Sequence, residues 1–219
     1  MTAAPTLQQQ TSLAISSVRS PEMLWVKSGA SISYGASQVW YPSWLQRMSG
    51  CGPTAASNLL WYLAATRPES CGALFAGDGT KRADMVRLMQ RVWQYVTPGM
   101  RGVDKASMLA EGGVQYGADN GIIIRPRVLE IPAADSGLYT DAVFAFLSTA
   151  FADDLPVAFL NLSNGALANL ESWHWVTLIA ANSALCAQMY DQGGRQMLDL
   201  DLWLQTTKKG GAFVVLEPA

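Results

Sequence analysis

Apolar residues recur at three- and four-residue spacing through the first two thirds of the chain. In residues 53–65 they include Ala55, Leu59 and Leu63, a spacing that predicts the buried face of a helix. Pro53 suits the first turn of this helix because it has no amide proton to leave unpaired there. The same spacing predicts further helices over residues 81–96, 105–116 and 140–154.

The pattern changes after Pro156, where short apolar runs are separated by Asn, Gly and Ser. Their length and their β-branched and aromatic content predict strands. Residues 121–131 also have an extended pattern, but Pro126 indicates an edge position because it cannot donate a hydrogen bond to a sheet ladder. Helices first and strands second predict an α+β fold, in which a helical half packs on a mainly antiparallel sheet. The predicted strands of the second half cover residues 156–162, 174–181, 184–191 and 212–217.

No internal repeat, low-complexity tract or clean linker divides the 219 residues. This length suits one domain with a substantial core. The polar residues 1–20 predict a flexible N-terminal tail, and residues 21–219 predict the domain. Its helical half is expected over about 44–152 and its sheet half over about 153–219.

Composition and charge narrow the class of protein. Hydrophobic residues make up 50% of the chain and charged residues 15%, which is typical of a globular protein. The formal net charge is −2, so electrostatics gives no reason to expect binding to nucleic acid or an anionic membrane. No targeting peptide and no apolar run long enough to span a bilayer is present, so a cytoplasmic location is expected.

The chain has three cysteines, Cys51, Cys71 and Cys186, and one histidine. An odd number of cysteines without C-x-x-C spacing argues against a disulfide framework, and a single histidine argues against a structural zinc site. No metal and no cofactor is therefore expected. At least one thiol remains free, either as core filling or as a nucleophile.

Cys51 stands in the stretch SGCGPTAASNLL, immediately before the first predicted helix. Unpaired amide protons and the helix dipole at such a position favour a thiolate. Gly50 and Gly52 are expected to leave room for a substrate backbone at the sulfur, and the Cys51 amide could face a developing oxyanion. The position alone fits a buried cysteine beside a tight turn equally well.

A cysteine nucleophile needs a base, and His174 is the only histidine. The base in turn needs a group that orients it. If the runs beginning at His174 and ending at Asp191 form a hairpin around residues 182–183, Asp191 lies beside His174. A one-residue bulge is expected to turn the Asp191 side chain away. Cys51, His174 and Asp191 are thus the predicted catalytic residues.

Two further groups are candidates for substrate contacts. Gln46, five residues before Cys51, is the predicted side-chain donor of an oxyanion hole, and Gln38 is a second candidate. Trp44, Trp173 and Trp175 are predicted to line a substrate cleft, although core packing would also explain some of the tryptophans near these motifs.

The blocks CGPTAASNLLWYLA, HWVTLIA and YDQGG resemble the papain-like cysteine peptidases, and within them the bacterial branch of bacteriocin leader-processing peptidases. The order Gln, Cys, His, Asp of that family is reproduced by Gln46, Cys51, His174 and Asp191. The resemblance covers about residues 44–204 and implies a papain-like fold and a thiol mechanism. In that family the Gln usually stands one position further from the Cys, and the leader-processing members carry a transporter portion that this sequence lacks.

The leading hypothesis is a cysteine peptidase or amidase that acts on a peptide or amide substrate through a thioester. If an amine resolves the thioester instead of water, the same residues would serve an acyl or peptidyl transferase. A binding protein that keeps the fold without turnover is the alternative from another class. The sequence does not identify the substrate.

Overall fold

The strands of the second half of the chain pair into one mixed-length, antiparallel sheet. The computed structural model describes residues 15–28 and 31–219, and in this part of the chain the sheet has the order β4-β9-β5-β6-β7-β8, with β1 (Ile15–Ser17) beside β6. The edge strand β4 contains Pro126, as its missing amide proton predicted. The other strands are β4 (Ile124–Ile131), β5 (Val157–Asn161), β6 (His174–Asn182), β7 (Cys186–Asp191), β8 (Gly194–Asp199) and β9 (Gly211–Pro218).

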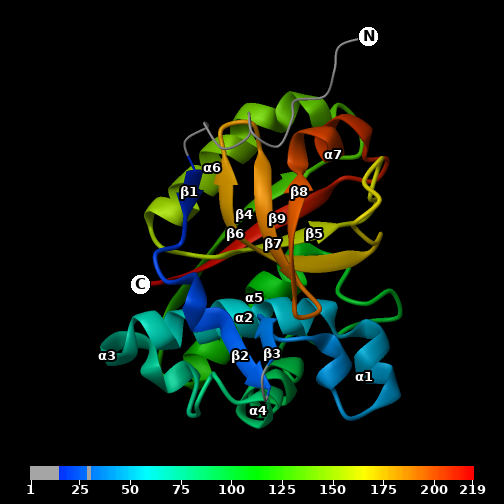
Figure 1. Cartoon of the computed structure of the whole chain (residues 1–219). Coiled ribbons are helices and arrows are strands. Elements are labelled where there is room, and N and C mark those ends of the chain that lie inside the picture. Colours follow the sequence, from blue (N-terminus) through cyan, green and yellow to red (C-terminus); the bar gives the residue numbers. More distant parts are fainter. Residues whose placement is uncertain (1–14, 29–30) are drawn as a thin grey trace.

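The helices of the first half surround one central helix, α2 (Cys51–Thr66). Every residue of α2 from Gly52 to Ala64 is buried, because neighbouring elements cover it on all sides. Figure 1 shows α2, α4 and α5 below the sheet, and α6 and α7 above it. The other helices are α1 (Trp44–Ser49), α3 (Pro68–Cys71), α4 (Arg82–Trp93), α5 (Ala106–Asp119), α6 (Thr140–Ala152) and α7 (Leu200–Thr206).

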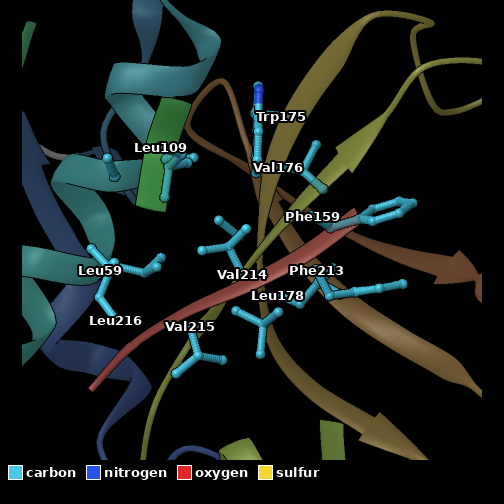
Figure 2. Close-up of a cluster of buried hydrophobic side chains, with 14 of the residues drawn as sticks. Leu59, Leu109, Phe159, Trp175, Val176, Leu178, Phe213, Val214, Val215 and Leu216 are labelled. Atoms are coloured by element: carbon cyan, nitrogen blue, oxygen red, sulfur yellow. The ribbon is translucent and has the colours of Figure 1, made fainter. Parts of the chain in front are cut away.

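Helices cover both faces of the sheet, and the alternation of side chains along β9 shows this directly. Figure 2 shows Val214 and Leu216 on the side of the helices that carry Leu59 and Leu109. Phe213 points to the opposite side, where its ring centroid lies 6.3 Å from that of Phe146 on α6. A strand buried on both faces needs a continuous apolar run, which β9 has.

The N-terminal segment joins the fold earlier than the sequence predicted. A tail was expected over residues 1–20, but β1 pairs with the end of β6, and the Arg19 amide donates to the Asp154 carboxylate at 2.7 Å. These backbone hydrogen bonds hold a segment whose side chains carry little apolar signal. Residues 1–14 lie outside the described residues. A further hairpin, β2 (Trp25–Ser28) with β3 (Ser31–Tyr34), forms a separate two-stranded sheet.

The hairpin of β6 and β7 contains a β-bulge. Ala180 lies opposite Gln188, whereas Leu178 lies opposite Met189, so Ile179 is an extra residue on β6. The Ile179 carbonyl accepts a hydrogen bond from the Val18 amide at 3.0 Å, so the N-terminal segment contacts the bulge.

The predicted α+β class is confirmed: a helical half with Cys51 at a helix start packs on a mainly antiparallel sheet. This is the arrangement that the papain-like resemblance implies. Among the described residues, no helix has the length and apolarity needed to cross a membrane.

Candidate active site

Cys51 is the first residue of α2, and Gly50 is its N-cap. The first amides of a helix have no acceptor within the helix and carry the positive end of its dipole. The Cys51 thiol is half-buried, so it remains accessible from one side. This position favours negative charge on an oxyanion that forms beside the sulfur.

His174 begins β6 and is buried, with 4% of its surface exposed. A nitrogen of its ring, Nε2, lies 2.7 Å from Oδ1 of Asp191. Burial acts to lower the pKa of His174, but hydrogen bonds to Asp191 and to Cys51, together with their negative charges, outweigh it and raise the pKa to about 10. The ring therefore keeps its second proton at neutral pH and contacts both partners.

Asp191 ends β7 and reaches His174 because of the bulge. The pairing of Thr177 with Tyr190, continued by one residue, places Asp191 opposite Val176. Asp191 therefore points to the same face of the sheet as His174, and the two residues are diagonal neighbours on adjacent strands. A one-residue bulge was expected to turn the Asp191 side chain away. That expectation is wrong. Ala180 pairs with Gln188 on the turn side of the bulge, and if this register continued without a bulge, Asp191 would lie opposite Thr177. Its side chain would then point to the other face of the sheet from His174.

A small pocket beside Cys51 contains Gln38 and not Gln46. Residues 44–49 form α1 rather than an extended segment, and Gln46 lies on this helix outside the pocket lining. Gln38 precedes it on a 3-10 turn, where its Nε2 donates to the Arg47 carbonyl at 3.0 Å. Among the described residues, its buried Oε1 has no hydrogen-bond partner. The pocket is lined by Ala36, Gln38, Cys51, Thr54, Ala55, Asn58, Trp175, Val176, Thr177, Tyr190, Asp191 and Gln192.

The glycines beside Cys51 serve packing rather than substrate access. A Cβ at Gly50 would lie 2.4 Å from the Gln46 carbonyl oxygen, and a Cβ at Gly52 would lie 2.6 Å from the Val103 side chain. Both distances are shorter than van der Waals contact. Val103 in turn accepts a hydrogen bond at its carbonyl from Trp175 Nε1 at 2.6 Å. The loop around Val103 is thus packed between Gly52 and the strand that carries His174.

The three predicted cleft tryptophans lie in different environments. Trp175 is 2% exposed and lines the pocket beside Cys51. Trp44 lies on the outer face of α1 and is 68% exposed. Trp173 is 41% exposed, precedes His174, and has the Lys209 ammonium 4.4 Å from its ring centroid. Only Trp175 adjoins the pocket.

A larger cavity of about 520 Å³ lies at the same end of the sheet. It includes Leu160, which pairs with Trp175, and Asp104, which follows Val103. The cavity shares no lining residue with the pocket, and its walls come from both the helical half and the sheet half. Its lining is Asp104, Lys105, Ala106, Ser107, Glu130, Ile131, Pro132, Tyr139, Leu160, Leu162, Gly211 and Ala212. Within residues 15–28 and 31–219, no three His, Cys, Asp or Glu side chains gather as a metal site would require.

Gln38 lines the pocket, although the sequence pattern indicated it only as a second candidate after Gln46. It stands thirteen residues before Cys51, and α1 lies between the two. No local pattern connects them. The signal would have been the cap Ser43, whose side chain accepts from the Gln46 amide and so starts a helix before Cys51.

Comparison with known proteins gives little sequence similarity. No protein-family model matches the chain. No curated protein matches it in sequence either. Among solved structures, the chain is similar to the crystal structure of the Pseudomonas avirulence protein AvrPphB, with a TM-score of 0.38 and 10% sequence identity over 78% of this chain and 92% of the other.

Proposed function

We propose that this protein is a cysteine peptidase or amidase with Cys51 as nucleophile, His174 as acid–base and Asp191 as the group that orients His174. One observation carries the proposal: Nε2 of His174, the only histidine of the chain, lies 2.7 Å from Asp191 Oδ1, and Cys51 is near enough to the same ring to raise its pKa. A nucleophile, a base and an orienting carboxylate in series are the requirements of acyl transfer. The papain-like resemblance of the sequence supports the same assignment.

The reaction follows from the protonation of these groups. The Cys51 thiolate attacks the carbonyl carbon of an amide, and the electron pair of the C=O bond moves to oxygen. The protonated His174 ring donates its proton to the leaving nitrogen as the C–N bond breaks, which leaves a thioester on Cys51. His174 then accepts a proton from water as the water attacks the thioester, and the acid is released with the thiolate restored.

Gln38 supplies the second donor of the oxyanion hole. The Arg47 carbonyl is an acceptor, so the amide end of Gln38 that faces it is the nitrogen, Nε2. An amide nitrogen carries two N–H groups, and the second is the donor proposed for the oxyanion. The Cys51 amide, at the first position of α2, supplies the other N–H. This assignment replaces Gln46 as the predicted donor.

The test compares two thiols of the same chain, Cys51 and Cys186. Iodoacetamide at pH 7 is expected to modify Cys51 at least about tenfold faster than Cys186, measured by mass spectrometry of the intact protein and its peptides. Cys186 is the matched control because it is also half-buried, while burial and the neighbouring Asp199 charge raise the pKa of its thiol. Equal rates at both thiols would contradict an activated nucleophile.

A second measurement separates hydrolysis from transfer. The protein is incubated with a peptide library, with and without glycinamide as an added amine, and products are identified by mass. Hydrolysed peptides in both samples support a peptidase or amidase. Adducts with glycinamide in place of free acids would indicate a transferase, and no product from the library would count against both activities.

A further inference from the structure

The segment that delivers His174 to the site is a long connection, residues 162–173, between β5 and β6. Its two ends are neighbours, because Asn161 and His174 are paired residues of the two strands. A connection of this length does not by itself hold its last residue in one orientation. The orientation of His174 therefore depends on how this connection is anchored.

Asn161 anchors it from inside the core. The Asn161 side chain is fully buried, its Nδ2 donates to the Glu171 carbonyl, and its Oδ1 accepts from Trp203 Nε1 at 3.1 Å. Because an indole N–H is only a donor, it fixes which end of the amide is oxygen. The amide nitrogen must then face Glu171, three residues before His174.

Trp203 is itself held rigidly. It is fully buried on α7, and its ring meets Phe159 edge to face with centroids 4.7 Å apart. Its Nε1 also donates to the Ser163 carbonyl at 2.9 Å, which holds the first residues of the same connection. Near its end, the Ser172 hydroxyl donates to Asn164 Oδ1 at 3.0 Å. Both limbs of the connection are thereby tied to the core and to each other.

The residue between this anchor and His174 has an unusual backbone. Trp173 has a φ of 60°, a left-handed conformation that is strained for a bulky side chain. Such a conformation persists only where the surroundings hold the chain on both sides. Here the Asn161 bond to Glu171 holds one side, and the pairing of β6 that starts at His174 holds the other.

We propose that Asn161, oriented by Trp203, is a positioning residue that sets the orientation of the His174 ring through the Glu171 carbonyl. Asn161 touches neither substrate nor reacting atoms and acts only through the backbone of residues 171–174. The proposal deepens the proposed function, since it concerns the base of that site. Its test uses a readout that does not need turnover.

The readout is the ring of His174. Because the chain has one histidine, the imidazole signals of untagged, ¹⁵N-labelled protein are unambiguous, and their titration gives the pKa of His174 directly. In the wild type, burial lowers this pKa, but the contacts with Asp191 and Cys51 raise it by more, to about 10. A displaced ring loses those contacts, so its titration midpoint falls.

Asn161→Leu removes the donor and the acceptor at nearly constant volume. We expect the His174 midpoint to fall by about one unit or more, equivalent to about a tenfold change in the protonation equilibrium. Trp203→Phe keeps the ring stack and removes only the N–H, so a smaller fall is expected. Asn161→Asp is the conservative variant, because its carboxyl group, once protonated, can again donate to the Glu171 carbonyl. The His174 ring signals of this variant should approach those of the wild type as the pH is lowered.

The matched control is Asn182→Leu, the same change at the far end of β6. Asn182 is also buried, and its Oδ1 accepts from the amides of Ala184 and Cys186, so its loss should lower stability and leave the His174 midpoint unchanged. An unchanged midpoint in Asn161→Leu, or equal falls in Asn161→Leu and Asn182→Leu, would overturn the proposal. If Asn161→Leu does not fold, Trp203→Phe decides, and a wild-type midpoint there overturns it. If the His174 midpoints change as expected in the variants but Cys51 of the wild type does not react, the role of Asn161 stands and the proposed peptidase or amidase function is wrong.

Discussion

Cys51 and the pair of His174 and Asp191 owe their positions to different kinds of structure. Cys51 is placed by one continuous element, because it is the first residue of α2 and the rest of that helix is buried. His174 and Asp191 are placed by three strands, a bulge and a long connection whose contacts span distant parts of the chain. The first arrangement is local and the second is not.

This difference predicts how each part responds to change. A helix start tolerates substitution of its own side chain, because backbone bonds further along the helix hold it. A pair held by strand register responds to changes several residues away, since any shift of register moves the side chains to other faces. The following variants test this contrast.

The largest effect is expected from Cys51→Ala. Removing the nucleophile should reduce peptide or amide cleavage by about 10³-fold or more, while the free energy of unfolding changes by less than about 1 kcal/mol because α2 is unaffected. Product formation and denaturant unfolding measure the two quantities. Cys71→Ala is not a matched control, since that thiol is fully buried; Cys186→Ala is, and it should keep activity. Substantial cleavage by Cys51→Ala would end the nucleophile assignment.

His174→Ala should have the next largest effect, about 10²- to 10⁴-fold on cleavage. The pKa of His174 is raised to about 10, so below that pH the ring places a positive charge near the Cys51 sulfur. Alkylation of Cys51 should therefore continue at pH 6 in the wild type and slow by at least about tenfold in His174→Ala. Rate against pH is measured for both proteins, with Cys186 as the internal standard. Superimposable curves would show that the histidine does not act on the thiol.

Gln38→Ala and Gln46→Ala form a matched pair that tests the oxyanion hole. Loss of one donor to the oxyanion costs about 10²- to 10³-fold in kcat, so Gln38→Ala should lower kcat by up to that amount with little change in KM. Gln46→Ala should stay within a few-fold of the wild type, because Gln46 does not line the pocket. The reverse ranking would restore the donor predicted from the sequence.

Asp191→Asn should reduce cleavage by about 10- to 100-fold, less than loss of the acid–base itself. It should also lower the pKa of His174, because the Asp191 carboxylate helps to raise it. A pKa raised by folding stabilises the protein below the unfolded value of about 6.5, and this stabilisation disappears as the pH rises toward about 10. The stability difference between the wild type and Asp191→Asn should therefore be largest near pH 6 and vanish near pH 10. A difference that does not vary with pH would argue against the ion pair.

The smallest effect on cleavage is expected from Gly52→Ala, although this residue adjoins the nucleophile. An added Cβ would lie 2.6 Å from Val103, so the loop must shift, at a cost of about 1–3 kcal/mol in the free energy of unfolding. Gly102→Ala is not a suitable comparison because φ is positive there; Gly72→Ala is, since open space surrounds it. Thermal unfolding measures both. Unchanged stability together with a large loss of cleavage would mean that Gly52 serves substrate access after all.

The sequence predicted what depends on local patterns. The periodicity of Leu59 and Leu63 indicated α2, and Pro126 indicated an edge strand. The hairpin that joins His174 and Asp191 was expected from spacing alone, and the two side chains do lie within hydrogen-bonding distance.

What the sequence could not predict depends on contacts between distant segments. β1 lies on the sheet because of backbone pairing, which leaves no trace in side-chain pattern. Gln38 reaches the pocket because α1 folds between it and Cys51. The extra residue Ile179 has no sequence signal, since a bulge is a property of a pair of strands and not of either strand alone.

Because of the bulge at Ile179, the site is sensitive to whether an insertion or deletion in this hairpin contains an odd or an even number of residues. Side chains alternate with a period of two, so the insertion or deletion of one residue between His174 and the turn exchanges the faces of everything on one side of it. Two residues restore them. The hairpin between His174 and Asp191 should therefore vary in length only by pairs of residues, unless a second bulge accompanies a single insertion. The Val18 amide donates to the Ile179 carbonyl, so the N-terminal segment helps to hold the bulge and with it the register of the hairpin.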